Sequence, residues 1–206
     1  MGVLSASTIK ERMAMKVSNP QSLVVTPLFD RDSTLSADSL DLRLGCYFLF
    51  SPLPPKLFLA LDDQALKGAH ARVHVPFGDY VVVPAHQTVL GATLEFIKLP
   101  ADVSGQILTK SSLARTFVVI ETAPWIHPSY RGCLTLEIAN VSNTPLLLHP
   151  GVAIGQLVLQ TVEIDKLPTV EHLSGNYLGP VYPEAPKFGR IQKTLGEFGI
   201  ATVQMP

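Results

Sequence analysis

The segment KSSLAR, from Lys110 to Arg115, gathers side chains that could hold an anion. A lysine precedes two hydroxyl groups, Ser111 and Ser112, and Arg115 comes four residues after Ser111. If the segment forms one helical turn after a strand, Ser111 and Arg115 share a face and the backbone N–H groups of the turn point out beside them. This pattern is typical of a phosphate site. The alternative is an ordinary serine cap followed by a solvated arginine.

A single carboxylate, Glu137, interrupts an apolar strand pattern about twenty residues later, in CLTLEIAN. Because side chains alternate along a strand, Glu137 and Thr135 fall on the face opposite the predicted core face, which carries Leu134, Leu136 and Ile138. A buried carboxylate needs a partner or a raised pKa, since burying it unpaired costs free energy. Arg115 is the obvious cation. Glu137 is therefore either an acid–base residue or half of a structural ion pair.

The turn between these two motifs, WIHPSYRG, contains two aromatic residues and a histidine. Trp125 or Tyr130 could stack on a base or fill the core, and we expect core packing for Trp125. His127 precedes a proline in a loop, where a histidine is more often solvated than catalytic.

The elements that must position these residues are mainly strands. Residues 5–16 have helical spacing, with Ser5 or Ser7 as the cap and Ile9 and Met13 on one face. Alternating or β-branched runs follow, separated by Pro, Gly, Asn and Asp turns, at 23–29, 40–50, 71–75, 80–84, 88–99, 116–122, 133–141, 145–149 and 152–163. The pattern predicts a mainly β sandwich or barrel with a short N-terminal helix.

The composition restricts the kind of ligand and partner. Hydrophobic residues make up 47% of the 206 residues and charged residues 16%, with a mean hydropathy of +0.28. Since about a quarter of residues are charged in a typical soluble domain, we interpret the low value as surface buried between subunits. The net charge of −1 lacks the basic excess that nucleic acids or anionic membranes require. A small anionic ligand needs only a few cations.

The two cysteines and the chain's hydropathy profile favour a cytoplasmic protein. Cys46 and Cys133 lie far apart in apolar runs without a CxxC motif, which is typical of buried thiols in a reducing compartment. The N-terminal residues lack the apolar core of a signal peptide, and no apolar run approaches the ~20 residues of a membrane span. We expect no membrane or nucleic-acid partner.

Periodicity disappears after residue 166, where Pro, Gly, Tyr and Lys accumulate. We therefore divide the chain into a β domain, 1–166, and a C-terminal arm, 167–206. The arm is either a disordered tail or a lid that orders over a ligand. As a lid it could supply stacking and phosphate contacts through Tyr177, Tyr182, Lys187, Arg190 and Gln192.

Taken in order, KSSLAR, ETAPWIHPSYRG, LTLEIAN and LHPGVAIGQLV resemble the motifs of the dCTP deaminases, in the trimeric dUTPase superfamily. LSASTIKERM resembles the family's opening helix and DSLDLRLG one of its strands, so the resemblance covers residues 4–163. It implies a homotrimer of distorted, jelly-roll-like β-barrels with nucleotide sites at subunit interfaces. It also implies hydrolytic deamination of a deoxycytidine nucleotide, dCTP giving dUTP and ammonia, without a catalytic metal.

The resemblance gives each candidate residue a role. Glu137 matches the catalytic glutamate, which takes a proton from water and delivers protons to N3 and the leaving amino group of cytosine. Ser111 would hold the water and stabilise the tetrahedral adduct, and Arg115 would orient Glu137. The substrate-contact positions are Lys110, Ser112, Ala123, His127, Thr135, Leu136, Tyr182, Lys187 and Gln192. Mg²⁺ would accompany the triphosphate as a charge neutraliser.

The sequence also lacks the signature of the other large class of base deaminases. Zinc-dependent enzymes hold their metal through H-x-E and P-C-x-x-C, and neither occurs in this chain. Without zinc to acidify it, the attacking water must be activated by a positioned base.

Three departures from the family pattern border the predicted base and sugar positions. Lys110 stands where the family has an arginine that can bind in bidentate fashion. The stretch from Arg115 to Thr122 is one residue shorter and carries Glu121 where a histidine is common. His127 replaces an aspartate that positions the attacking water in dUTPases, which argues against dUTPase activity. The preferred substrate stays open between dCTP, dCMP and a 5-modified dCTP. A dUTP diphosphatase or bifunctional enzyme and a non-enzymatic nucleotide sensor are the alternatives.

Overall fold

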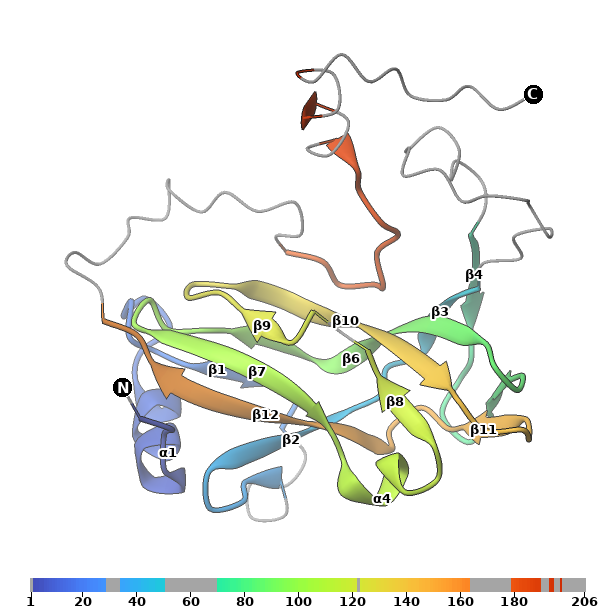
Figure 1. Cartoon of the computed structure of the whole chain (residues 1–206). Coiled ribbons are helices and arrows are strands. Elements are labelled where there is room, and N and C mark those ends of the chain that lie inside the picture. The colour runs from blue at the N-terminus through green and yellow to red at the C-terminus, as the bar shows by residue number, and fades with distance from the viewer. Residues whose placement is uncertain are drawn as a thin grey trace.

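The fold consists of two main β-sheets with a helix at the N-terminus (Figure 1). The computed structural model describes residues 2–28, 34–50, 70–121, 123–163 and 179–189, with residues 193, 194 and 197. The elements are α1 (Ala6–Ala14), β1 (Val24–Thr26), β2 (Ser39–Arg43), β3 (Tyr47–Phe50), β4 (Ala71–His74), β5 (Val81–Val83), β6 (Thr88–Lys98), β7 (Val103–Thr109), α4 (Ser111–Ala114), β8 (Val118–Ile120), β9 (Trp125–Ile126), β10 (Arg131–Asn140), β11 (Leu146–Leu148) and β12 (Ala153–Thr161).

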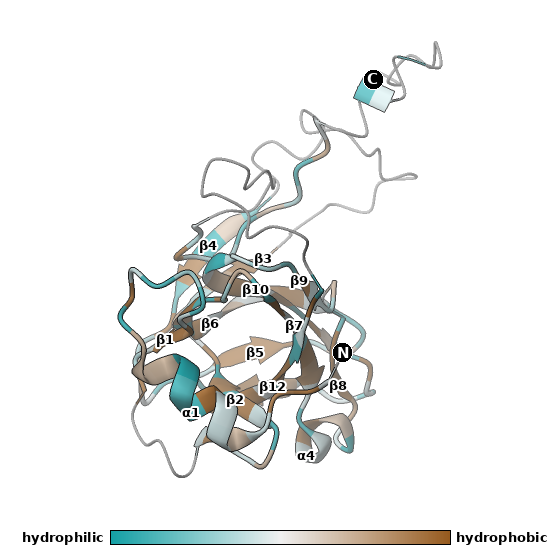
Figure 2. Ribbon diagram, turned by 90° about the vertical axis from the view of Figure 1, so that its left-hand side faces the viewer, coloured by the Kyte–Doolittle hydropathy of each residue, from teal (hydrophilic) through white to brown (hydrophobic). Residues whose placement is uncertain are grey.

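The larger sheet has the order β4-β3-β6-β10-β8, with β1 added along β6, and the smaller has the order β2-β12-β7-β9. Strands β5 and β11 form a separate pair. Strands from both main sheets surround a common interior and are mostly hydrophobic in Figure 2. Their inward side chains form one core cluster. Fully buried examples are Leu42 and Leu157 in the smaller sheet, and Phe48 and Leu136 in the larger sheet. The mainly β, jelly-roll-like prediction is confirmed, although the strands that the structure describes do not close into a continuous barrel.

Helix α1 forms where its spacing predicts. The Ser5 hydroxyl accepts a hydrogen bond from the Thr8 backbone N–H at 3.4 Å, which satisfies one free donor at the helix start. Ile9 is fully buried and Met13 packs against the core, so the predicted apolar face is the one that docks. Arg12 then binds both carboxylate oxygens of Asp102, at 2.6 and 3.3 Å, and fixes the helix to the turn before β7.

The run at 40–50, expected as one strand, is two strands that lie in different sheets. Its break falls at Gly45, whose N–H donates to the Ala92 carbonyl oxygen at 2.8 Å. A Cβ at Gly45 would lie 3.1 Å from that oxygen, so a larger residue would crowd this crossing from β2 to β3. Strand β7 was not predicted, because Ser104, Gly105 and Gln106 dilute its apolar alternation.

A buried ion pair connects the two main sheets. Glu95 of β6 is fully buried and accepts hydrogen bonds from the Arg43 backbone N–H at 2.8 Å and from the Arg43 guanidinium at 3.3 Å. Burial raises the pKa of Glu95, and the contacts with Arg43 oppose that shift. Because β6 also pairs with β10, this contact fixes β2 relative to the strand that carries Glu137.

Candidate active site

The outer face of β10 carries the candidate acid–base residue. Leu136 and Ile138 are fully buried in the core and Leu134 nearly so, which confirms the predicted alternation of this strand. Thr135 and Glu137 lie between them and face away from the core, each partly buried. The side chain of Leu136 thus points into the core, and only its main chain can contact a nucleotide on the outer face.

Glu137 is a half-buried carboxyl group with an unsatisfied oxygen. Its Oε2 atom is buried and has no hydrogen-bond partner among the described residues. Burial raises the pKa of Glu137, and the negative charge of Glu121 raises it further. A carboxyl group in this state can exchange protons closer to neutral pH than an ordinary glutamate can.

Glu121 is the neighbour of Glu137 across the β8–β10 ladder. Its backbone N–H donates to the Glu137 carbonyl oxygen at 2.8 Å, and its side chain is exposed. Sequence reasoning marked Glu121 only as a departure from the family pattern and gave it no role. The signal that could have found it is the pairing of the two strands, which a single sequence does not contain.

The first described residues of the C-terminal arm, 179–184, lie beside the first half of β10, and the chain then rises away from the sheets (Figure 1). Two short backbone hydrogen bonds hold these residues on β10, from Gly179 to Arg131 and from Cys133 to Pro180, both 2.7 Å. Further along, the Glu184 backbone N–H donates to the Thr135 hydroxyl at 3.1 Å. The arm therefore reaches the outer face beside Glu137 within the same chain.

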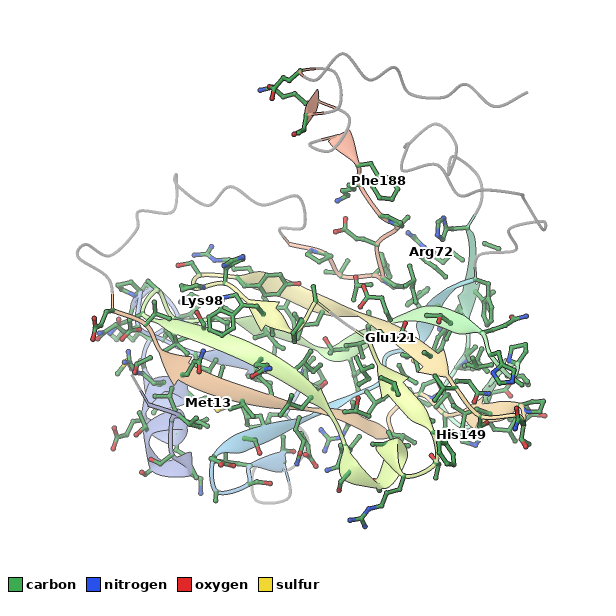
Figure 3. All side chains as sticks on the ribbon, in the orientation of Figure 1. Met13, Arg72, Lys98, Glu121, His149 and Phe188 are labelled. Carbon is green, nitrogen blue, oxygen red and sulfur yellow. The ribbon has the colours of Figure 1, made fainter. Side chains whose placement is uncertain are left out.

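Aromatic contacts also hold the arm against β3 and β4. The ring of Tyr182 meets the Tyr47 ring edge-on at 4.6 Å between centroids, and the Arg72 guanidinium lies 5.0 Å from the Tyr182 centroid. Arg72 and Phe188 lie on the same side of the larger sheet in Figure 3. Lys187 forms an ion pair with Glu184 at 2.8 Å. Of the five arm residues proposed from the sequence, Tyr182 thus contacts the larger sheet, and Lys187 pairs with Glu184, which is bound to Thr135 of that sheet.

The anion motif forms the predicted helical turn. Helix α4 begins at Ser111 directly after β7, and the Arg115 N–H donates to the Ser111 carbonyl oxygen at 3.1 Å. The side chains of Ser111, Ser112 and Arg115 are exposed. Lys110 differs, because its ammonium group forms an ion pair with Asp41 of β2.

Within one chain, the structure does not bring the KSSLAR segment and Glu137 together. Strand β8 pairs Val118 with Asn140, and the Val141 N–H then donates to the Phe117 carbonyl oxygen at 3.0 Å. Arg115 lies beyond that end of β8, whereas Glu137 lies opposite its other end. At about 3.3 Å per residue, the four residues from Glu137 to Val141 alone span about 13 Å. In the described residues Glu137 has no ion pair with Arg115.

The turn between the motifs is more open than the sequence indicates. Trp125 is 46% exposed, so the expected core packing is wrong. The reason is alternation in β9, where Ile126 faces the core and Trp125 therefore faces out. Ala123 and His127 are exposed as well, while Tyr130 donates its hydroxyl to the Cys133 carbonyl oxygen at 2.8 Å.

Three of the arm residues expected to contact the ligand fall outside the described residues, namely Tyr177, Arg190 and Gln192. Within the described ranges, no group of three His, Cys, Asp or Glu side chains is placed to hold a metal ion. None of the described helices is long and apolar enough to span a membrane.

The chain belongs to a known family. The chain matches the family described as dCTP deaminase-like over residues 3–162, and it is a member of that family. The resemblance seen in the sequence motifs is confirmed.

Several curated proteins that are similar to this chain are named dCTP deaminases. A "dCTP deaminase, dUMP-forming" of Methanobrevibacter smithii is 30% identical over 164 residues, covering 79% of this chain and 81% of that protein. The dCTP deaminase of Halorubrum lacusprofundi is 30% identical over 190 residues, 91% of each chain. A dUMP-forming enzyme of Mycobacterium marinum is 37% identical over 130 residues, 62% of this chain and 67% of that protein.

The solved structure of 2'-deoxycytidine 5'-triphosphate deaminase from Agrobacterium tumefaciens has the same fold, with a TM-score of 0.58 and 23% identity. The match covers 78% of this chain but only 48% of that one, so this chain spans about half the length of the solved structure.

Proposed function

We propose that this protein deaminates dCTP by hydrolysis, with Glu137 as the general acid and base. The observation that carries the proposal is the half-buried Glu137 carboxyl group on the outer face of β10, close to Thr135. Its Oε2 has no hydrogen-bond partner in the part of the chain that the structure describes. Its raised pKa suits a group that must accept a proton and then return it near neutral pH. Membership in the dCTP deaminase-like family supports the choice of substrate class.

The reaction requires one water molecule, and Glu137 relays both of its protons. Water attacks C4 of cytosine while Glu137 takes one proton and passes it to N3, which gives a tetrahedral adduct with a hydroxyl and an amino group on C4. Glu137 then takes the hydroxyl proton and passes it to the amino group, the C4–N bond breaks, and ammonia leaves as the C4 carbonyl forms. The product is dUTP. Thr135 and the main chain at Leu136 and Ala123 would lie beside the base, and His127 beside the sugar.

Ser111 and Arg115 would reach this site from a neighbouring subunit of a homotrimer. Both side chains are exposed in a single chain. They lie beyond the Val118 end of β8, whereas Glu137 lies by the Ile120 end. The surface next to them is apolar, because Phe117 is 62% exposed and Val141 48% exposed. Covering that surface with a second copy would bury apolar area and could deliver a cation to the Glu137 of another subunit.

The phosphates would bind near Lys110 and Ser112, with Lys187, Tyr182 and Gln192 of the arm as additional contacts. Mg²⁺ would enter with the triphosphate as part of the substrate and neutralise its charge.

A second candidate is a bifunctional enzyme that also hydrolyses dUTP to dUMP and pyrophosphate. It is favoured by relatives named "dCTP deaminase, dUMP-forming". The presence of His127 where dUTPases have an aspartate opposes it.

One experiment separates the candidates. The protein is incubated with dCTP, dCMP and 5-substituted dCTP, and nucleotides, ammonia and pyrophosphate are measured. We expect dUTP and ammonia from dCTP without pyrophosphate. Release of dUMP and pyrophosphate would establish the bifunctional enzyme, and nucleotide binding without any product would favour a sensor.

A further inference from the structure

Glu121 and Glu137 face each other across the end of the β8–β10 ladder. The antiparallel register pairs Ile120 with Ile138 and Val119 with Ala139, and one step further places Glu121 opposite Glu137. The hydrogen bond from the Glu121 N–H to the Glu137 carbonyl oxygen, 2.8 Å, continues that register. Directly opposed residues point to the same face with Cβ atoms about 4.5–5.5 Å apart. Two carboxyl groups are therefore held side by side by the backbone.

The two groups have unequal surroundings. Glu121 is exposed to water, whereas Glu137 is half-buried and its Oε2 has no hydrogen-bond partner among the described residues. Like charges at this distance disfavour each other, and the more buried group takes up the proton more readily. The raised pKa of Glu137, from burial first and from Glu121 next, agrees with this geometry.

Among the described residues, the other charged groups near this face have contacts of their own. On β6 the residue opposite Glu137 is Leu90, which cannot titrate. The arm contributes Glu184 and Lys187, which pair with each other. Strands β3 and β4 contribute three groups that contact the arm or one another, namely Tyr47, Arg72 and His74.

We propose that Glu121 is a positioning residue that acts through Glu137: its charge, held directly across the strand ladder, makes the buried carboxylate a stronger proton acceptor. This inference rests on the proposed function of Glu137. A cation such as Arg115, arriving from a neighbouring subunit, would weaken Glu137 as a base by stabilising its ionised form. The charge of Glu121 offsets that effect, so the carboxylate can still take a proton from water and hand one to the leaving amino group.

The test is a charge series at position 121 in the full-length protein. Glu121→Gln removes the charge with little change in size, Glu121→Lys reverses it, and Glu11→Gln removes an exposed carboxylate from α1 as the matched control. Glutamate side chains are labelled with ¹³C at the carboxyl carbon, and the Glu137 signal is assigned by its loss in Glu137→Gln. The titration midpoint of Glu137 and the acid limb of the pH–kcat profile are then measured.

We expect the Glu137 midpoint to fall by about half a pH unit or more in Glu121→Gln, to fall further in Glu121→Lys and to stay unchanged in Glu11→Gln. The acid limb of kcat should move to lower pH in the same order. A merely structural role for Glu121 would not order the midpoints by charge. An unchanged midpoint in Glu121→Gln would overturn the proposal, and this variant decides alone if Glu121→Lys fails to fold.

The carboxyl titration needs no turnover, so it separates this inference from the proposed function. If the titration midpoint of Glu137 follows the charge at position 121 but the protein releases no ammonia from dCTP, the role of Glu121 is supported and the deaminase assignment is refuted. If ammonia release is normal but the midpoint does not move, the deaminase assignment is supported and the role of Glu121 is refuted.

Discussion

The ammonium group of Lys110 donates a hydrogen bond to the Asp41 carboxylate, so the lysine of the anion motif is already engaged. The other carboxylate oxygen of Asp41 lies 3.5 Å from the Gln156 side-chain amide. These three residues come from the neighbouring strands β2, β12 and the end of β7. A nucleotide phosphate that binds Lys110 must therefore compete with Asp41 or share its lysine.

Replacing Asp41 by Asn should tighten the binding of dCTP, because the competing charge is removed while the side-chain shape is kept. A half-buried ion pair of this kind is worth up to about 1 kcal/mol, which corresponds to an approximately fivefold lower Kd. Calorimetric titration in a Glu137→Gln background would measure it without turnover. The gain should be smaller for dCMP, and it should vanish when Lys110 is also changed to Ala. A gain that persists without the lysine would show that Asp41 acts in another way.

Changing Glu137 to Gln should abolish deamination while leaving the binding of dCTP nearly unchanged. The amide has the size of the carboxyl group but cannot take a proton from water, and loss of a general base typically costs about 10²–10⁴-fold in rate. Ammonia release and equilibrium binding would be measured on the same preparation. Near-normal turnover in this variant would refute the mechanism.

The same variant should be more stable than the parent protein at neutral pH. Burial raises the pKa of Glu137 in the folded state. At pH values between the ordinary glutamate pKa and this raised pKa, the unfolded chain therefore binds fewer protons than the folded protein does. Parent stability falls across that window, whereas Gln carries no such penalty. We expect a gain on the order of 1 kcal/mol at pH 7.5 that disappears at about pH 4. Urea unfolding at both pH values would check it, and an equal gain at both would contradict the assignment to ionisation.

Two inactive variants should restore activity to each other if sites combine residues from two subunits. Glu137→Gln and Arg115→Ala chains would be unfolded, mixed in equal amounts and refolded together. About one site in four would then combine an intact Glu137 with an intact Arg115 from its neighbour. Ammonia release well above that of either variant refolded alone is the expected result. No recovery, with mixed oligomers confirmed by mass spectrometry, would mean that both residues act from one chain.

Gly132 should be required for the arm to lie on β10. Its φ of +140° disfavours larger residues, and a Cβ there would lie 2.5 Å from Pro180. We expect Gly132→Ala to release the arm and speed tryptic cleavage at Lys187. Gly78→Ala is the matched control, because Gly78 also has a positive φ but has open space around it. Equal cleavage in both variants would show that the arm does not depend on this contact.

The local patterns of the sequence were sufficient for the elements that depend on near neighbours. Ser5 caps α1 and Ile9 docks it, and the KSSLAR segment makes its helical turn. Alternation in β10 placed Leu136 in the core and Glu137 outside, because side chains on a strand change face at every residue. The ordered motifs together identified the family.

Tertiary structure alone decided which distant residues meet. The pairing of β8 with β10 places Glu121 beside Glu137, and the order of the smaller sheet brings Asp41 to Lys110 across 69 residues of chain. The pairing of β9 with β7 turns Ile126 to the core and leaves Trp125 exposed. The pairing of β8 with β10 leaves Arg115 at the far end of β8 from Glu137. Strand register and sheet order arise from the packing of the whole core, so a local pattern fixes which way a side chain faces but not what it faces.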